Sequence, residues 1–194
     1  MNGNALIGMA VDESGSMQRV AAATREGIES FLADQREVDG ECRLSMVMFN
    51  NRMRVVCAGE DVRNIGHVSY APGGGTAPLD AVGVTIHGMD KWLANHPDFD
   101  GSKLVVIWTD GFENASSQYT QAQVNALIDE RQQQGWNFQF MGAGDGWRSA
   151  EMFSNIPVAN VRNFAATGAG FHESYANLSN STLGMRSSGQ YGGA

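Results

Sequence analysis

Three short segments carry oxygen-bearing side chains at positions where apolar or glycine-rich runs end. Asp12, Ser14 and Ser16 follow the apolar run ALIGMAV. Thr76 ends the stretch GGGT, and Asp110 directly follows the apolar run LVVIWT. Carboxylate and hydroxyl oxygens are the ligands that a hard cation such as Mg²⁺ prefers. These residue types therefore indicate a divalent-metal site, provided that the fold brings the three segments together.

Each segment also has an ordinary structural explanation. Ser14 or Ser16 can cap the helix that follows them, because short hydroxyl side chains accept hydrogen bonds from the first helical amides. Thr76 can cap the next helix in the same way, and Asp110 with the glycine after it is a common turn sequence. Taken one at a time, the segments favour these explanations. Convergence of the five side chains at one place would favour the metal.

The chain between these residues alternates between strand-like and helix-like patterns. Short apolar runs predict strands, and apolar residues three or four positions apart predict helices. The expected strands are 5–11, 42–49, 53–57, 104–109, 136–141 and 158–164. The expected helices are 17–38, 79–93, 120–134 and 171–185, with a short one at 149–153. The short turn NNR at 50–52 makes the second and third strands antiparallel neighbours.

This alternation predicts an α/β fold: a three-layer, doubly wound, mostly parallel sheet with helices on both faces. Ligands of such sheets bind beyond the carboxyl ends of the strands, where the candidate residues are expected to lie. The sequence predicts a single domain over residues 1–186. The polar, glycine-rich segment 187–194 is expected to be a flexible C-terminal tail.

Composition and charge argue against several classes of function. The 194-residue chain has a formal net charge of −8, which disfavours nucleic-acid binding and a basic membrane-surface patch. No apolar run approaches membrane-spanning length, and the N-terminus lacks the pattern of a signal peptide. Cys42 and Cys57 form no disulfide framework. These features favour a cytoplasmic protein without a nucleic-acid or membrane partner.

The segments DESGS, GGGTAPLDA and TDGFENAS, in this order, resemble the metal ion-dependent adhesion site (MIDAS) of the von Willebrand factor A (VWA) domain. Asp12, Ser14 and Ser16 match the family's Asp-x-Ser-x-Ser motif. Thr76 matches its lone threonine in a glycine-rich loop, and Asp110 matches its aspartate after a central strand. The resemblance covers residues 5 to about 185. Within the family, the chain resembles the bacterial and phage stand-alone type. It implies a Rossmann-like, six-stranded sheet with one antiparallel edge strand.

The resemblance also implies a function. The site would hold Mg²⁺ or Mn²⁺, with the serines and the threonine binding directly and one or both aspartates acting through water. Neutral hydroxyl ligands leave the ion electrophilic, and a partner's Asp or Glu carboxylate can fill its open position. This predicts a protein-interaction module and not an enzyme, with a partner such as an ATPase or another operon-encoded protein. Family members also switch when the last helix, here 171–185, slides along the sheet.

Two other functions compete with this interpretation. A Mg²⁺-dependent phosphohydrolase could use Asp12 as a nucleophile at the end of the first strand. That chemistry commonly needs a second aspartate two residues later, where this chain has Ser14, and a phosphate-binding lysine that is not well placed here. The second competitor is a structural module whose metal only stabilises loops.

Asp12 is expected to have a second role: it orients the serine hydroxyls, as residues behind metal ligands commonly do. Two further acidic residues, Glu13 and Asp80, lie close to these motifs. Alternation along the chain points Glu13 the other way, so it is expected to be solvated. Asp80 lies one helical turn after Thr76, where a carboxylate is expected to stabilise the start of a helix.

Overall fold

A mixed sheet forms the centre of the computed structural model, which describes residues 3–189 and 191, apart from the side chain of Trp147. The described residues form a 6-stranded sheet in the order β3-β2-β1-β4-β5-β6. The strands are β1 (Ala5–Asp12), β2 (Cys42–Phe49), β3 (Met53–Asp61), β4 (Ser102–Thr109), β5 (Asn137–Ala143) and β6 (Val161–Phe164). Edge strand β3 runs antiparallel to β2, and the other pairings are parallel. The predicted α/β sheet with one antiparallel edge strand is confirmed.

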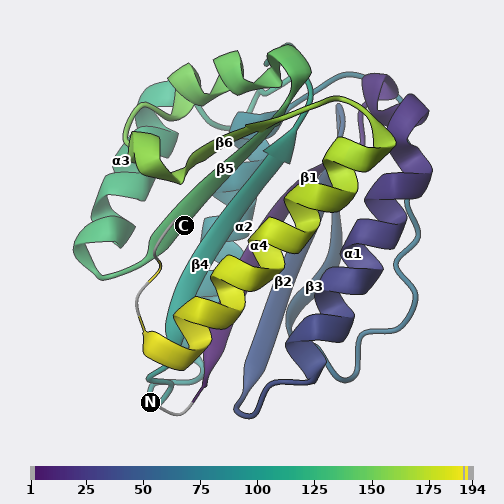
Figure 1. Cartoon of the computed structure of the whole chain (residues 1–194). Helices are drawn as coiled ribbons and strands as arrows, with labels where there is room; N and C mark the ends of the chain where they lie inside the picture. Colours follow the sequence, from purple (N-terminus) through teal and green to yellow (C-terminus); the bar gives the residue numbers. More distant parts are fainter. Residues whose placement is uncertain (1–2, 190, 192–194) are drawn as a thin grey trace.

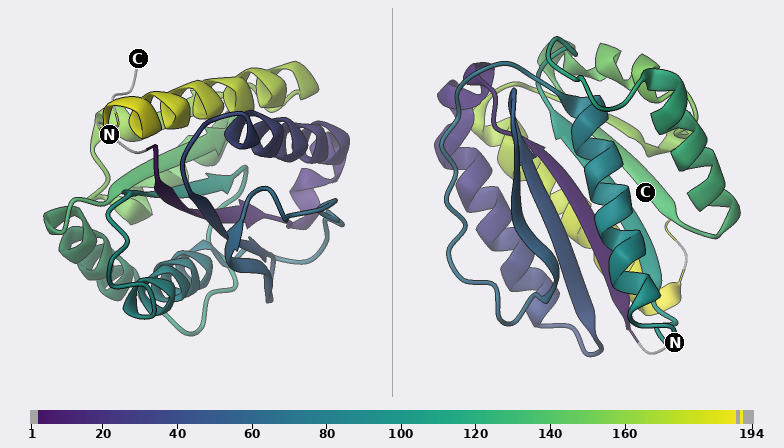
Figure 2. Two further views of the ribbon diagram at one scale, coloured as in Figure 1. Left: turned by 90° about the horizontal axis from the view of Figure 1, so that it is seen from below. Right: turned by 180° about the vertical axis from the view of Figure 1, so that it is seen from behind.

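Helices cover both faces of this sheet, which gives three layers (Figures 1 and 2). Helices α1 (Ala21–Arg36) and α4 (Gly168–Ser188) lie side by side on one face. Helices α2 (Pro78–Ala94) and α3 (Gln121–Gln133) lie on the other. The 3-10 helices η1 (Gly15–Val20), η2 (Gly144–Phe153) and η3 (Val158–Asn160) complete the order of elements. Among the described helices, none combines the length and apolarity that crossing a membrane requires.

Strand β1 lies at the middle of the sheet and is buried along its whole length. Ile7, Met9 and Val11 belong to the core under α1 and α4, whereas Leu6 and Ala10 belong to the core under α2 and α3. A strand covered on both faces needs apolar residues at successive positions, which explains the unbroken run ALIGMAV. The strand is therefore packed on both faces up to its last residue, Asp12.

The register of the parallel strands brings the candidate residues to one edge. Val11 pairs with Trp108 of β4, so Asp12 lies level with Thr109 and next to the start of the loop that carries Asp110. On its other side Asp12 pairs with Phe49, the last residue of β2. Because parallel strands end at the same edge, side chains that follow β1 and β4 become neighbours despite their distance in sequence.

Most differences from the predicted elements lie at their ends. The first predicted helix divides into η1 and α1, and β3 continues to Asp61, with irregular register against β2. Helix α4 begins at Gly168 because the Thr167 hydroxyl caps it by accepting the Gly170 N–H. It extends through Ser188, inside the predicted tail, and the Tyr191 hydroxyl donates to Gln139 at 2.9 Å. Residues 190 and 192–194 of that tail lie outside the described residues.

Close packing seats α4 against both the sheet and α1. The Tyr175 ring stacks on Trp108 of β4 with ring centroids 3.8 Å apart. On its α1 side the same ring contacts Gly27, where an added Cβ would lie 2.1 Å from it. A glycine is therefore required at position 27 for this arrangement of the two helices. Ser179 adds a hydrogen bond of 2.6 Å to the Asp34 carboxylate of α1.

A buried arginine fixes the C-terminal end of α4. Arg186 is 2% exposed and donates to the carbonyl oxygens of Gly3, Gln35, Val38 and Asp39 at 2.7–3.3 Å. Burial lowers the pKa of this guanidinium from its ordinary value. Its four backbone partners join α4 to the end of α1 and to the chain entering β1. Any sliding of α4 along the sheet has to break these bonds.

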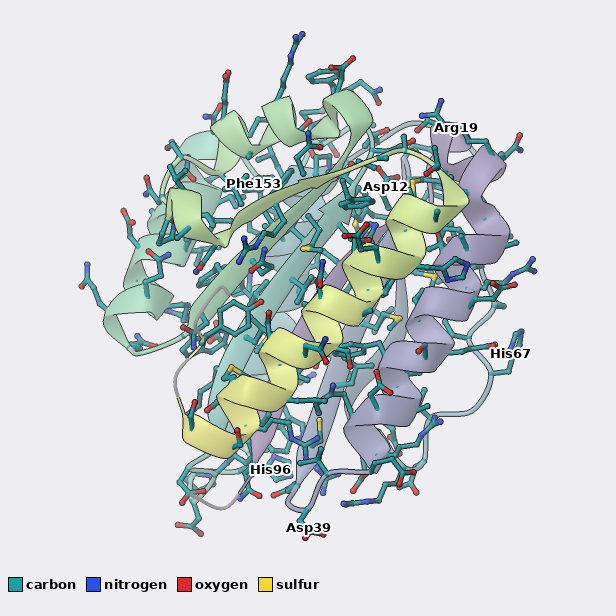
Figure 3. The ribbon with its side chains drawn as sticks, viewed as in Figure 1. Asp12, Arg19, Asp39, His67, His96 and Phe153 are labelled. Carbon is teal, nitrogen blue, oxygen red and sulfur yellow. The ribbon has the colours of Figure 1, made fainter. Side chains whose placement is uncertain are left out.

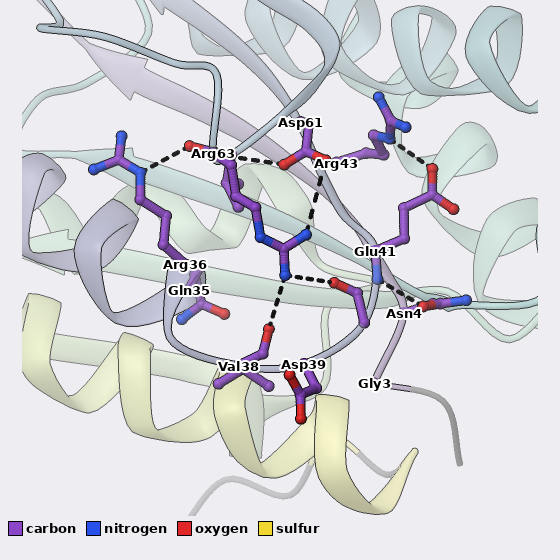
Figure 4. Close-up of polar contacts among 12 residues, drawn as sticks. Gly3, Asn4, Gln35, Arg36, Val38, Asp39, Glu41, Arg43, Asp61 and Arg63 are labelled. Atoms are coloured by element: carbon purple, nitrogen blue, oxygen red, sulfur yellow. Dashed lines mark hydrogen bonds and ion pairs between the residues drawn. The ribbon is translucent and has the colours of Figure 1, made fainter.

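Other arginines reinforce this end of the molecule (Figure 4). Arg63, just after β3, donates to the carbonyl oxygens of Val38 and Gly40 at 3.4 and 3.2 Å. Arg43 of β2 donates to the Glu41 carboxylate at 2.7 Å. Several arginines therefore hold the turn between α1 and β2, which lies at the opposite end of the strands from Asp12.

Replacing Arg186 tests this anchoring. Arg186→Met keeps most of the side-chain volume but leaves buried carbonyl oxygens without their donor, so we expect a loss of about 2–4 kcal/mol in the free energy of unfolding. Urea denaturation measures this loss. Arg25→Ala, at an exposed position on α1, is the matched control and should stay within about 0.5 kcal/mol of wild type. An Arg186→Met protein as stable as the control would contradict the anchoring.

Candidate metal site

Asp12 forms the buried base of the site. Its side chain is 0% exposed, Oδ1 accepts the Ser14 N–H at 2.7 Å, and Oδ2 accepts the Thr109 hydroxyl at 2.5 Å. The Tyr70 hydroxyl donates to the Asp12 carbonyl oxygen at 2.5 Å. The pKa of the Asp12 carboxyl is raised to about 6, chiefly by burial; hydrogen bonds from Ser14 and Thr109 oppose this increase, and the nearby Asp110 charge adds a smaller one. A carboxylate in this position is one that a bound cation would stabilise.

The two serine hydroxyls face each other, and that of Ser16 also contacts Asp110. Ser14 Oγ and Ser16 Oγ are 3.1 Å apart, and the Ser16 hydroxyl donates to Asp110 Oδ1 at 2.5 Å. Ser14 occupies the position before η1 yet makes no side-chain capping hydrogen bond. The capping explanation therefore does not account for its hydroxyl. Ser14 is buried, whereas Ser16 is exposed and leaves the site open to solvent on its side.

Thr76 reaches the same place from the loop before α2. Its N–H donates to Asn114 Oδ1 at 2.9 Å, and the Asn114 N–H donates to its carbonyl at 3.0 Å. The residue that precedes α2 is Ala77, so Thr76 does not cap this helix. A Cβ added to Gly111 would lie 3.2 Å from Thr76 Oγ1 and 3.7 Å from Asp12 Oδ2. The threonine hydroxyl and the buried carboxylate thus border one small space, and Gly111 forms part of its wall.

The set of donors fits a hard divalent cation. The five side chains supply two carboxylates and three hydroxyls, all oxygen donors from three loops at one edge of the sheet. Within the described part of the chain, no group of three or more His, Cys, Asp or Glu side chains is placed to hold a metal. This hydroxyl-rich set suits Mg²⁺ or Mn²⁺ better than zinc, which prefers nitrogen and sulfur.

Glu13 is buried, and its predicted solvation is wrong. Its carboxylate pairs with Arg54 of β3 at 2.6 Å and accepts the Ala71 N–H at 2.8 Å. Its carbonyl oxygen accepts the Gly73 N–H at 2.9 Å. Glu13 thereby ties the loop that carries Thr76 to the end of β1. The pattern around Glu13 gives no signal for this, because Arg54 lies 41 residues further along the chain.

Asp80 lies in the first turn of a helix, as predicted, and also holds a second segment. Its carboxylate accepts the backbone N–H groups of Ser117, Gln118 and Tyr119 at 2.8, 2.9 and 2.9 Å. It lies in the first turn of α2, but these bonds hold the segment that follows Asp110 against that helix. Asp80 and Glu13 therefore position the two loops that approach the β1 turn.

Comparisons with known proteins find similarity in solved structures. No family model and no curated protein matches this sequence. The chain is similar to proximal thread matrix protein 1 from the mussel byssus with a zinc-occupied MIDAS motif, with a TM-score of 0.68, 16% identity and coverage of 93% of this chain and 46% of that chain. It is also similar to a von Willebrand factor type A protein from Catenulispora acidiphila, with a TM-score of 0.63 and 15% identity over 93% of this chain and 43% of that chain.

A third similar structure is the manganese-loaded TRAP protein of Plasmodium vivax, with a TM-score of 0.60 and 15% identity over 90% of this chain and 72% of that chain. The chain spans less than half the length of the mussel and Catenulispora chains. Similarity at this level of identity establishes architecture. The chain has the fold of a VWA domain.

The buried Glu13–Arg54 pair yields a test that needs no metal. In Glu13→Gln the charge-assisted bonds to Arg54 and Ala71 weaken, so we expect a loss of about 1–3 kcal/mol in stability. The amides of Ala71 and Gly73 should then exchange their hydrogens faster than they do in wild type, and this acceleration should exceed that of the β1 amides. Urea denaturation and amide hydrogen exchange measure the two effects. Glu37→Gln, at an exposed position, should change neither, and unaltered exchange at Ala71 would contradict the positioning of the loop.

Proposed function

We propose that this chain is a divalent-metal-binding module that recruits a protein partner. Asp12, Ser14, Ser16, Thr76 and Asp110 would hold Mg²⁺ or Mn²⁺, and the partner would contribute an Asp or Glu carboxylate. The observation that carries the proposal is the convergence of these oxygens from three loops, with the Ser16 hydroxyl bonded to the Asp110 carboxylate and the Ser14 hydroxyl capping no helix.

Each side chain has a distinct part in this proposal. When bound, the ion supplies an electrophilic centre with a position left for an external ligand. The serine and threonine hydroxyls are neutral donors, so they leave positive charge uncompensated. Asp110 accepts the Ser16 hydroxyl and would direct its lone pairs toward the shared space. Asp12 accepts the Ser14 N–H and the Thr109 hydroxyl, and so holds the turn that carries the serines against β4. The exposed side of the site at Ser16 is where the partner's carboxylate would enter.

Two of the similar structures support a divalent cation, since one has a zinc-occupied MIDAS motif and the other is manganese-loaded. A phosphohydrolase is less well supported by the geometry. Asp12 is 0% exposed, so a substrate in solvent does not reach its carboxylate, and Ser14 stands where this chemistry needs a second aspartate. We therefore propose a binding role without catalysis. Its partner would be an acidic surface of another protein, such as an operon-encoded ATPase.

Metal titration tests the ligand set. We expect calorimetry with Mg²⁺ or Mn²⁺ to give a binding heat with wild type and none with Asp12→Ala/Asp110→Ala, which lacks both carboxylates. Asp98→Ala/Asp129→Ala removes two exposed aspartates from other surfaces and is the charge-matched control. It should bind as wild type does. Circular dichroism confirms that each protein is folded, and equal heats from the three proteins would rule out the proposed site.

A second test separates recruitment from mere stabilisation. Metal at a hundredfold excess over its Kd should stabilise the folded state by about 2.7 kcal/mol, because only the folded chain assembles the site. We further expect acetate to bind the metal-loaded protein and not the chelator-treated one, measured by NMR chemical-shift changes at the Ser14 and Ser16 amides. Metal-dependent stabilisation without metal-dependent acetate binding would instead favour a metal that only stiffens the loops.

A further inference from the structure

Arg19 places a positive charge at the rim of the candidate metal site. It lies in η1, directly after the serine motif, and its guanidinium nitrogen is 3.5 Å from Asp110 Oδ2. The Arg19 side chain is 63% exposed, whereas that of Asp110 is 1% exposed. Figure 3 shows Arg19 and Asp12 at the same end of the sheet. The arginine thus reaches the site from the solvent side.

The contact with Asp110 does not give Arg19 a structural function. An exposed ion pair of this length contributes about 0–1 kcal/mol. The arginines that hold this fold together are bound differently. Arg131 is 12% exposed and donates to both carboxylate oxygens of Asp90 at 2.8 Å, and buried Arg186 donates to several carbonyls. Arg19 has neither the burial nor the short paired bonds of these residues.

A cation in the site would release Arg19 from Asp110. The Asp110 carboxylate would then neutralise the ion, and the ion would repel the guanidinium. The displaced side chain remains attached to η1 beside the solvent-open position. A guanidinium presents several N–H donors in a planar fork that matches the two oxygens of a carboxylate. Its expected ligand is therefore a second carboxylate, arriving from outside.

We propose that Arg19 binds the partner's carboxylate together with the metal, taking the oxygen that the metal does not. This inference rests on the proposed function and names a specificity determinant for it. The overall charge of the chain favours such a residue. With a formal net charge of −8, the molecule repels an acidic partner at long range, and a local positive charge offsets that repulsion where the carboxylate docks.

The test measures metal and carboxylate binding separately on the full chain. Mn²⁺ affinity is obtained from water-proton relaxation, and acetate is then titrated into protein saturated with Mn²⁺, where displacement of bound water lowers the relaxivity. The variants are Arg19→Ala and Arg19→Lys. Arg25→Ala, six residues later on α1, is the matched control at an exposed position.

Opposite effects on the two ligands are expected. Arg19→Ala should bind Mn²⁺ at least as tightly as wild type, because a like charge is removed from the rim. Its acetate Kd should rise about five- to tenfold, the loss expected for one net hydrogen bond at a solvent-exposed position. Arg19→Lys should fall between the two, since it keeps the charge without the fork. Arg25→Ala should match wild type for both ligands.

Three outcomes overturn the inference. Acetate binding that is unchanged in Arg19→Ala shows that Arg19 does not contact the carboxylate, while the proposed function stands. Weaker Mn²⁺ binding in Arg19→Ala shows that the residue positions Asp110 instead of binding a partner. Absence of any acetate effect on Mn²⁺-loaded wild type overturns this inference and the proposed recruitment of a carboxylate together.

Discussion

The arrangement of the site depends on one buried carboxylate, that of Asp12 at the end of β1. The strand enters the core between β2 and β4, and its register sets Asp12 beside Thr109, whose hydroxyl donates to it at 2.5 Å. A buried carboxylate of this kind is costly without compensation, and its pKa is raised to about 6 by that burial. The hydroxyls and loops around it are arranged to supply part of this compensation, and a divalent cation would supply the rest.

The loops that complete the site are held by residues outside the donor set. Glu13 pairs with Arg54 and binds Ala71, which fixes the approach of the Thr76 loop. Asp80 holds the segment after Asp110 through three backbone amides. A cation site built from neutral hydroxyls needs such support, because the oxygens must be in place before binding rather than drawn in by charge. Glu13 and Asp80 thus fix the loops that carry the candidate donors Thr76 and Asp110.

The two ends of the sheet differ in exposure and in how firmly they are anchored. At the end of β1 that carries Asp12, an exposed serine and an exposed arginine leave the site accessible. At the other end, buried Arg186 joins α4 to the carbonyls of α1 and of the residues before β1. The sliding of the last helix that the VWA resemblance implies would have to break these bonds. In this chain α4 is therefore anchored at its C-terminal end.

Sequence patterns alone determined the alternation of strands and helices, the antiparallel edge strand and the five candidate donors. These features depend on local chemistry: apolar runs for buried strands, a short turn for the hairpin, and oxygen-bearing side chains directly after strands. Only the tertiary structure decided that Ser14 caps no helix, that Glu13 is buried, and that Arg19 reaches Asp110. The last two depend on partners supplied by other segments, 41 residues away for Glu13 and Arg54 and 91 residues away for Arg19 and Asp110. A local pattern cannot specify such a partner, because strand order and register bring the segments together only in the folded chain.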